Sequence, residues 1–327
     1  MRTNVLVTGA GGFIGSHLTE ALLHAGGKVR ALVHYNSRGS WGHLDELRND
    51  FGEKLDVRPA DITDSFLVRE LVKDCEIVFH LAALIAIPYS YQAPSSYLTV
   101  NAQGTLNLLE ASRQERVKRV IVTSTSEVYG SASYTPMDEA HPLHAQSPYA
   151  ASKIAADKLA ESFYSSFGLP VVILRPFNTY GPRQSARAVI PTVLTQALSG
   201  AKEIQLGNLE PRRDLTFVKD TVRAFLLAAE KPELEGQTIH FGQGKSICIS
   251  ELAQMCLKTA GSDARIVSLD RRRRPEASEV ELLICDHSKA TRLLGWEPTI
   301  TLETGLRHTA EYLSSHLSDY RSEVYVL

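Results

Sequence analysis

Hydroxyl and carboxylate side chains gather at the end of an apolar run in the stretch VTSTSEVYG, residues 122–130. A strand that only fills a core has no need for so many polar residues. Thr125 and Glu127 are two residues apart, so on a strand both side chains leave the same face. The carboxyl ends of strands are where doubly wound sheets bind ligands. We therefore take Thr125, Ser126 and Glu127 as candidate catalytic residues. The plainer interpretation of Glu127 is a salt-bridged carboxylate at a strand end.

A tyrosine and a lysine follow in SPYAASK, and their spacing places Tyr149 and Lys153 on one face of a helix. Such a pair is common on helix surfaces and means little alone. Behind a dinucleotide-binding fold it indicates general-base chemistry, because an ammonium group and a positively charged nicotinamide both stabilise a tyrosinate. We predict that Tyr149 is the base, that Lys153 supports it, and that both contact the cofactor.

A glycine-rich turn, VTGAGGFIG, lies at the start of the chain. Gly9, Gly12 and Gly15 stand between an apolar strand and an amphipathic helix, a context that predicts a dinucleotide site rather than an ordinary tight turn. Glycines let the backbone approach a pyrophosphate, and the helix N-terminus supplies free N–H groups. Phe13 and Ile14, which begin that helix, complete the predicted contact.

The adenosine side of the predicted site lacks its usual acid. The second strand ends ALVHYNSRGSW, without a carboxylate for the ribose. This absence removes repulsion against a 2′-phosphate, and His34 or Arg38 can contact one, so NAD and NADP both remain candidates. Asp61 and Ile62, after the third strand, are placed to meet the adenine. The alternative for Asp61 is a turn or helix-cap residue.

Short apolar strands alternate with amphipathic helices along the first half of the chain. Strands rich in Val, Ile and Leu, separated by helices, predict a parallel sheet covered on both faces, a doubly wound α/β fold of the Rossmann type. After Arg175 the alternation loosens, and Pro and Gly accumulate. We predict a dinucleotide-binding domain over residues 1–175, with a return segment near 215–242. A smaller mixed α/β substrate domain is expected over residues 176–327.

Composition excludes several classes of protein. The 327-residue chain has a formal net charge of -2, which favours neither nucleic acid nor an anionic membrane surface. No apolar segment reaches the about 18 residues that span a bilayer, and no signal peptide is recognisable, so a cytoplasmic protein is expected. The 4 cysteines show no CxxC spacing and the 11 histidines no HExxH, so no metal is predicted.

Together these motifs resemble the extended short-chain dehydrogenase/reductases that modify nucleotide sugars. The resemblance covers nearly the whole chain and rests on TGAGGFIG, DITD, FHLAA, VNAQGT, STSEVYG, SPYAASK, RPFNTYGPR, RRDLTFVKD and LLGWEPTITLETGL, in that order. It implies further cofactor contacts from Leu81, Ala82, Ala83 and Asn101. The runs LVHYNSRGSWGHLDEL, AALIAIPYSY and RPFNTYGPRQSARAVIPT are similar to dehydratases of the legionaminic-acid pathway, which act on a nucleotide-linked N-acetylglucosamine.

The resemblance also implies a reaction. STSEVYG resembles 4,6-dehydratases and UDP-glucuronate decarboxylases, whereas simple 4-epimerases typically lack a carboxylate at Glu127. In a 4,6-dehydratase, Tyr149 with Lys153 and Thr125 removes the O4 proton while C4 gives hydride to the nicotinamide. Glu127 then takes the C5 proton, water leaves from C6, and the hydride returns to C6, so the recycled cofactor stays bound. The dTDP-glucose dehydratases carry Asp where Ser126 stands here. Ser126 is a poor acid, so Glu127 or a water would shuttle the proton.

The substrate of such an enzyme carries a diphosphate. Arginine suits this group better than lysine because it forms bidentate bonds, and the candidates are Arg183, Arg187, Arg213 and Arg274, with a surface role as the alternative for each. Asn178 in RPFN resembles the residue of this group that contacts the diphosphate region. The apolar candidates are Ile87 and Val189, for which burial in the core is the alternative.

Two long helices, around residues 101–114 and 149–167, carry apolar stripes. In the resembling group the equivalent helices form the four-helix interface of a homodimer, so a homodimer is implied. The alternative is that both stripes face the sheet.

Other functions compete with dehydration. A nucleotide-sugar 4-epimerase or an NDP-uronate decarboxylase would use the same oxidation at C4. For the decarboxylase, Arg213 is a possible partner for the substrate carboxylate. A non-catalytic NAD(P)-sensing regulator could dispense with Tyr149 and Lys153, which disfavours it.

Overall fold

The computed structural model describes residues 3–47 and 49–320. Its central element is a seven-stranded, wholly parallel sheet with the strand order β10-β6-β5-β4-β1-β2-β3. The strands are β1 (Asn4–Thr8), β2 (Lys28–Val33), β3 (Leu55–Pro59), β4 (Ile77–His80), β5 (Arg119–Thr123), β6 (Val171–Pro176) and β10 (Thr238–Phe241). The predicted doubly wound parallel sheet is confirmed.

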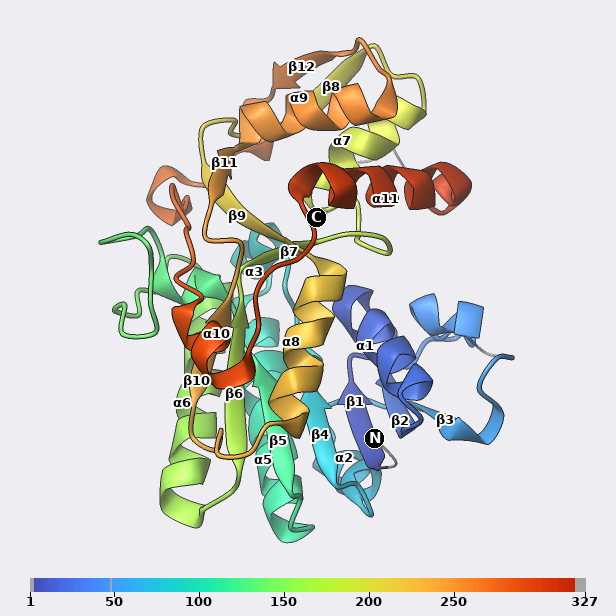
Figure 1. The fold of residues 1–327 in the computed structure, drawn as a ribbon, viewed down its shortest axis with the longest axis vertical. Helices are drawn as coiled ribbons and strands as arrows, with labels where there is room; N and C mark the ends of the chain where they lie inside the picture. The colour runs from blue at the N-terminus through green and yellow to red at the C-terminus, as the bar shows by residue number, and fades with distance from the viewer. Residues whose placement is uncertain (1–2, 48, 321–327) are drawn as a thin grey trace.

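Helices cover both faces of this sheet (Figure 1). One layer contains α1 (Phe13–His24) and α8 (Val218–Glu230), and the other contains α2 (Ser65–Val72), α5 (Gly104–Gln114) and α6 (Pro148–Phe167). Successive residues of β1 point to opposite layers, so Val5 and Val7 belong to the first core and Leu6 to the second. Burial on both faces explains why the strands are apolar throughout.

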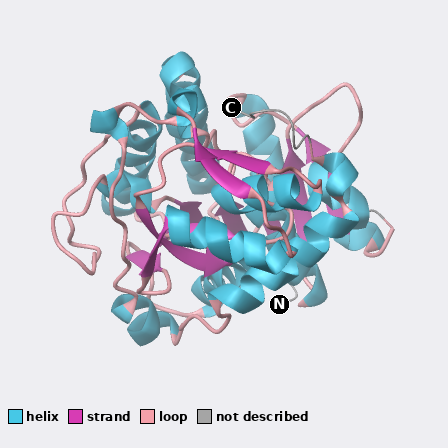
Figure 2. Ribbon diagram, turned by 90° about the horizontal axis from the view of Figure 1, so that it is seen from above, coloured by secondary structure: helices cyan, strands magenta, loops and turns pink. Residues whose placement is uncertain are grey.

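A second lobe is built from smaller sheets and further helices (Figures 1 and 2). One sheet has the order β11-β9-β7, and a parallel pair joins β12 to β8. The elements are β7 (Asn178–Tyr180), β8 (Glu203–Leu206), β9 (Arg212–Phe217), β11 (Ser246–Cys248), β12 (Arg265–Ser268), α7 (Val189–Leu198), α9 (Ile249–Ala260) and α11 (Leu302–Ser315). The helix α10 (Ser288–Leu294) instead lies against β10 and α8, beside the large sheet. Between β9 and β11 the chain returns to the large sheet through α8 and β10.

The long helix expected before β5 is interrupted. α3 (Ile87–Gln92) and α4 (Pro94–Tyr97) lead into a π-helical segment, η3 (Leu98–Gln103), which continues into α5. Single π turns inside helices often accompany functional sites, and Asn101 lies in this one. The other short helices are η1 (Gly42–Leu47), η2 (Gly52–Lys54), η4 (Ser126–Tyr129), η5 (Asp270–Arg272), η6 (Glu276–Ser278) and η7 (Leu317–Asp319).

Local signals in the sequence set the ends of the helices near the site. Asp64 accepts hydrogen bonds from the N–H groups of Phe66 and Leu67 and so caps α2. Ser147 caps α6 through the Ala150 N–H, and Gly168, at φ +65°, ends that helix. Capping at Ser147 places Tyr149 in the first turn of α6.

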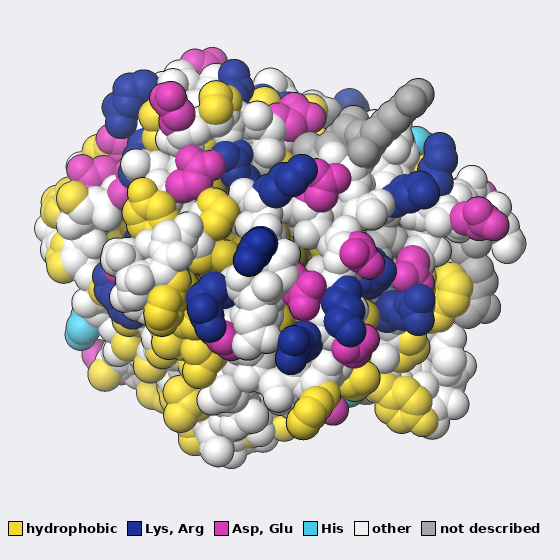
Figure 3. Space-filling model, turned by 90° about the horizontal axis from the view of Figure 1, so that it is seen from below, with side chains coloured by type: hydrophobic (Ala, Val, Ile, Leu, Met, Phe, Trp, Pro, Cys, Tyr) yellow, Lys and Arg dark blue, Asp and Glu magenta, His cyan; other side chains and the backbone are white. Residues whose placement is uncertain are grey.

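The face of the molecule seen from below intersperses Lys and Arg with Asp and Glu, and hydrophobic side chains gather toward one side of it (Figure 3). Among the described helices, none is long and apolar enough to cross a bilayer.

Candidate active site

The order of the strands reverses at β1. The chain proceeds from β1 to β2 and β3 on one side, and from β4 to β5 and β6 on the other. In doubly wound sheets, ligands bind outside the carboxyl ends of the strands at such a switch point. The glycine-rich turn, the segment after β4 and the segment after β5 all emerge at this edge.

The glycine turn has the close approaches that a dinucleotide site needs. Gly9 has φ +69°, and a Cβ there would lie 2.8 Å from the Ala82 backbone nitrogen. A Cβ on Gly15 would lie 2.1 Å from the Gly9 carbonyl oxygen. Gly12 caps α1 without a side-chain acceptor, so the N–H groups of the first turn, including those of Phe13 and Ile14, face the turn. These residues therefore fit a pyrophosphate.

The segment after β4 is held against this turn. Thr8 Oγ1 accepts hydrogen bonds from the Leu81 and Ala82 N–H groups at 3.1 and 3.0 Å. Thr8 also bonds His80 at 2.9 Å, and burial lowers the pKa of His80 to about 3, so its imidazole is neutral. Sequence reasoning missed Thr8 and His80. Ala83 follows directly and is half-buried.

Asn101 connects the π segment to the same region. Its Oδ1 accepts from the Leu84 N–H at 2.8 Å, and its Nδ2 donates to the Leu84 carbonyl at 2.9 Å and to Ser152 Oγ at 2.9 Å. Ser152 Oγ donates in turn to the Tyr149 carbonyl at 2.7 Å. Asn101 thus joins the loop after Ala83 to the helix that carries Tyr149. Both Oδ1 and Nδ2 of its side chain take part in these hydrogen bonds.

The residues expected around the adenosine lie beyond the ends of β2 and β3. His34 and Arg38 are exposed beyond the end of β2. Asp61 Oδ1 accepts from the Thr63 N–H and hydroxyl, both at 2.8 Å, and these bonds lower the pKa of the Asp61 carboxyl. This is the turn role weighed as the alternative for Asp61. Ile62 is buried and packs against Gly104.

The catalytic candidates come together at the end of β5, although not on the strand. β5 ends at Thr123, and Thr125 caps the 3₁₀ turn η4, where its Oγ1 accepts from the Glu127 N–H at 3.2 Å. The expectation that Thr125 and Glu127 share one face of a strand is therefore wrong, because the cap turns the chain. The Thr125 side chain also acts on the Tyr149 hydroxyl and lowers its pKa. Lys153 Nζ donates to the Thr123 carbonyl at 2.5 Å.

Burial sets the electrostatics of this group. Tyr149, Lys153 and Glu127 are only 7%, 4% and 9% exposed, and Ser126 is buried with them. Burial raises the pKa of Tyr149; the Thr125 side chain lowers it and the charge of Glu127 raises it further. Burial lowers the pKa of Lys153, against the opposing charge of Asp157. Glu127 is therefore close enough to Tyr149 to act on its ionisation.

A buried polar network that the sequence did not suggest lies behind these residues. Asp157 Oδ2 accepts from Ser124 Oγ at 2.7 Å, and from Arg175 Nε and Nη2 at 3.1 and 2.8 Å. Arg175 Nη1 donates to the Tyr129 hydroxyl at 2.5 Å. Asp157 follows Lys153 by one helical turn, and that spacing was the available signal. The network accounts for Ser124 and Tyr129 of VTSTSEVYG.

Two of the arginines that were predicted to bind the substrate lie near Glu127. Both are close to the carboxylate of Glu279, which the sequence did not single out. Arg274 Nη1 lies 4.0 Å from Glu127 Oε2 and 3.7 Å from Glu279 Oε1. Arg213 Nη2 lies 3.2 Å from the same Glu279 oxygen. Among the described residues, none accepts a hydrogen bond from Arg274 Nη1, although this atom is buried.

Other predicted substrate residues border the same region. Asn178 Oδ1 is buried, and no described group donates to it, which is the state expected of a ligand contact. Ile87 packs with Tyr97 and Tyr149, whose rings meet edge to face with centroids 6.2 Å apart. Arg187 is exposed and its charge acts on the Tyr97 hydroxyl.

Arg183 and Val189 lie elsewhere. Arg183 is 8% exposed, and its guanidinium pairs with Glu20 of α1 at 2.8 Å and Glu46 of η1 at 3.3 Å. A phosphate contact for Arg183 is at odds with this placement, because both carboxylates already satisfy it where the two lobes meet. Val189 begins α7 and packs against the core.

The switch point in the sheet, the glycine cradle and the tyrosine–lysine pair define an extended short-chain dehydrogenase/reductase that modifies nucleotide sugars. The chain belongs to the GDP-mannose 4,6 dehydratase family, which residues 6–309 match.

Members with different activities resemble the chain about equally. It is 31% identical to a dTDP-glucose 4,6-dehydratase of an Actinoplanes strain, over 96% of this chain and 98% of that protein. It is 30% identical to the UDP-N-acetyl-alpha-D-glucosaminuronate decarboxylase of Bacillus cytotoxicus, over 95% and 98%. Among solved structures, the UDP-glucuronic acid 4-epimerase of Bacillus cereus, in complex with UDP-glucuronic acid and NAD, is 30% identical with a TM-score of 0.88, covering 96% of this chain and 99% of that one. The family is therefore established and the particular reaction is not.

Proposed function

We propose that the protein is a nucleotide-sugar 4,6-dehydratase that makes an NDP-4-keto-6-deoxy sugar. The observation that carries this proposal is the buried Glu127 carboxylate beside Thr125 and Tyr149. Apart from the cofactor, oxidation at C4 needs only Tyr149 and the side chains that support it. Elimination of water across C5 and C6 needs a second base next to it, and Glu127 supplies one.

The residues divide the reaction among them. Tyr149, assisted by Thr125 and Lys153, takes the proton from O4. The resulting 4-ketone makes the C5–H acidic, and Glu127 removes that proton as the C6–O bond breaks. Ser126 is buried beside Glu127 but is a poor acid. The proton that Glu127 takes from C5 can therefore leave with the C6 hydroxyl as water, which returns Glu127 to its starting charge.

A nicotinamide dinucleotide fits the glycine turn and would accept the hydride from C4 and return it to C6. C5 would take up a proton as the hydride returns, which balances the proton that Tyr149 took from O4. We assign the pyrophosphate to Gly9, Gly12 and Gly15, on the basis of the cradle that a Cβ would fill. The adenosine is assigned to the rim formed by His34, Arg38, Asp61 and Ile62. NAD is bound in the epimerase of Bacillus cereus. The absence of an acid after β2 keeps NADP as the other candidate.

We place the diphosphate of the substrate near Arg187 and Asn178. Arg187 has no carboxylate within ion-pair distance among the described residues, and Asn178 Oδ1 is buried and accepts no hydrogen bond from a described group. Ile87 would then line the sugar beside Tyr149, and Arg213 and Arg274 would lie at the end of the sugar nearest Glu127. The resemblance to legionaminic-acid-pathway enzymes makes nucleotide-linked N-acetylglucosamine the first substrate to test.

Incubation with UDP-, GDP-, CDP- and dTDP-linked sugars, followed by mass spectrometry, tests the reaction. We expect a product lighter by one water. Loss of carbon dioxide from an NDP-uronate would identify a decarboxylase instead, and an isomer of unchanged mass would identify a 4-epimerase.

Replacing the proposed second base tests its role directly. Glu127→Gln should lower the rate of dehydration by about 10²- to 10⁴-fold, the usual contribution of a general base. Transient reduction of the cofactor, followed by absorbance, should persist because Tyr149 and Lys153 are intact. Glu281→Gln, an exposed glutamate, is the control. Unchanged dehydration in Glu127→Gln would refute the assignment.

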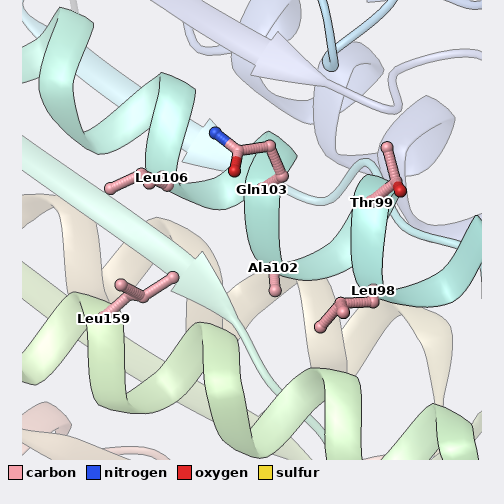
Figure 4. Close-up of a pocket in the computed structure, with 6 residues that line it drawn as sticks. All are labelled: Leu98, Thr99, Ala102, Gln103, Leu106 and Leu159. Carbon is pink, nitrogen blue, oxygen red and sulfur yellow. The ribbon is translucent and has the colours of Figure 1, made fainter. Parts of the chain in front are cut away.

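We also propose that the protein is a homodimer that pairs η3, α5 and α6 with those of a second copy. These helices border a groove of about 370 Å³ lined by Leu98, Thr99, Ala102, Gln103, Leu106 and Leu159 (Figure 4). Leu98 is 59% exposed. An apolar groove between two long helices supports a helical partner at this face.

A further inference from the structure

A loop of the second lobe lies against two elements of the first. This loop follows β7, and the Pro182 carbonyl within it hydrogen-bonds His17 Nε2 of α1 at 3.0 Å. Burial lowers the pKa of His17 to about 4, so its ring is neutral and the Nε2–H is the donor to the carbonyl. The next residue, Arg183, pairs with Glu20 of α1 at 2.8 Å and with Glu46 of η1 at 3.3 Å. The loop therefore holds both α1 and η1.

Arg183 combines an unfavourable backbone conformation with a buried charge. Its φ is +67°, in the left-handed region that residues with a side chain disfavour. Among the described residues, four other than glycine have a positive φ, and Arg183 is the only one of them that is buried. A buried guanidinium also has to be paired, because an unpaired charge in the interior is strongly unfavourable. Strained conformations of this kind cluster at functional sites.

The start of η1 is pressed against the glycine turn. The His43 N–H donates to the Gly11 carbonyl at 3.2 Å. A Cβ on Gly11 would lie 2.5 Å from the Trp41 carbonyl oxygen, and a Cβ on Gly42 would lie 2.5 Å from the Gly11 carbonyl oxygen. Gly11 stands in the middle of the turn that we assign to the pyrophosphate. Because the two backbones are in contact, the position of η1 helps to set the position of that turn.

The two partners of Arg183 differ in how firmly the rest of the protein holds them. α1 has 12 residues, and buried residues line it from Gly15 to Leu23. η1 has only 6 residues and buries Leu44 and Leu47, and 3₁₀ geometry is less stable than the α-helix. The second lobe contacts Glu46 twice, through the arginine and through the Tyr312 hydroxyl of α11 at 3.3 Å. η1 therefore depends on the second lobe more than α1 does.

We propose that Arg183 is a positioning residue for the dinucleotide, although it belongs to the lobe that the proposed function assigns to the sugar nucleotide. Arg183 holds η1 through Glu46, and η1 holds Gly11. The second lobe thereby stabilises the glycine turn in the conformation that accepts a pyrophosphate. The inference rests on the proposed function in one respect, which is that the dinucleotide occupies the glycine turn.

Binding of the dinucleotide alone tests this inference without turnover. NAD and NADP are titrated by calorimetry into the full chain freed of bound nucleotide, and the one that binds more tightly is used for the variants. We expect Arg183→Gln and Glu46→Gln each to weaken binding by about tenfold or more. The double variant should bind about as tightly as either single variant, because both substitutions break the same contact.

Glu20→Gln is the matched control. It removes a charge from the same guanidinium, but α1 keeps its own packing, so the affinity for the dinucleotide should stay within about twofold of the wild type. Its urea midpoint should still fall, as in Glu46→Gln. A purely structural role of Arg183 would instead lower stability and affinity together in both variants.

Three outcomes would overturn the inference. They are an unchanged affinity in Glu46→Gln, an equal loss of affinity in Glu20→Gln, and additive losses in the double variant. Glu46→Gln decides the matter even if Arg183→Gln does not fold. A wild type that binds neither dinucleotide would overturn the cofactor assignment as well. The dehydratase proposal is judged separately, by its product.

Discussion

Tyr149 is buried, and its burial disfavours the ionised form of the hydroxyl. Burial and the charge of Glu127 both raise the pKa of Tyr149, and they oppose the lowering effect of the Thr125 side chain. A base that must work near neutral pH therefore depends on positive charge from elsewhere in the site. In the proposed mechanism this charge comes from Lys153, which lies one helical turn away and is also buried.

Removing the Lys153 charge should shift the pH dependence of the reaction. The tyrosinate form is required, so the rate rises with pH through the pKa of Tyr149. In Lys153→Met that pKa rises further, so the acidic limb of kcat/KM should move to higher pH by about one unit or more. The rate at pH 7 then falls about tenfold for each unit. Lys158→Met, an exposed lysine of α6 paired with Glu161, is the control and should match the wild type. A limb that stays in place would contradict the role of Lys153.

At the scale of elements, α6 is tied to the sheet by charge as well as by packing. Asp157 joins α6 to Ser124 after β5 and to Arg175 on β6, and both members of the ion pair are almost wholly buried. This fixes the turn of α6 that carries Lys153 relative to the strand end that carries Thr125. The buried Asp157 Oδ1, to which none of the described residues donates, faces the same interior.

Breaking this pair should destabilise the fold. Asp157→Asn leaves the Arg175 guanidinium buried beside a neutral amide, and removal of one partner of a buried ion pair costs about 3–5 kcal/mol. Urea unfolding measures the loss. Glu161→Gln, on the exposed side of the same helix, should change the free energy of unfolding by less than about 0.5 kcal/mol. Equal stabilities for the two variants would show that the network contributes nothing.

At the scale of the whole molecule, the two lobes are joined on one side by the pairs that Arg183 makes with Glu20 and Glu46. The opposite layer, with η3, α5 and α6, carries the apolar groove. An exposed apolar groove on a helical layer is a surface that a second copy can cover.

A charge in this groove should prevent dimerisation. Leu98→Glu would bury an unpaired carboxylate at the proposed interface, so light scattering coupled to size exclusion should report a monomer where the wild type is a dimer. Leu67→Glu, at another exposed leucine on α2, is the matched control and should leave the mass unchanged. A monomeric wild type would refute the homodimer.

Much of the site could be predicted because its signals are local. Gly9, Gly12 and Gly15 lie where the chain itself turns from strand to helix, and Ser147 starts the helix that presents Tyr149 and Lys153. The geometry at Thr125 and Glu127 was predicted wrongly, because a hydroxyl cap two residues beyond a strand ends the alternation of faces. Asp157 and His80 were missed, since a polar residue within a helix or strand gives no sign of its distant partner.

The sequence alone determined the order of strands and helices, the dinucleotide turn and the tyrosine–lysine pair, because each depends on residues a few positions apart. Only the tertiary structure decided which arginine has which partner. From the sequence, Arg183 and Arg213 were candidates for the same role. In the structure, Arg183 pairs with Glu20 and Glu46, whereas Arg213 pairs with Glu279. The physical reason is that an ion pair between residues far apart in the chain is set by how the elements pack. The types and spacing of residues along the chain do not indicate which two residues will form such a pair.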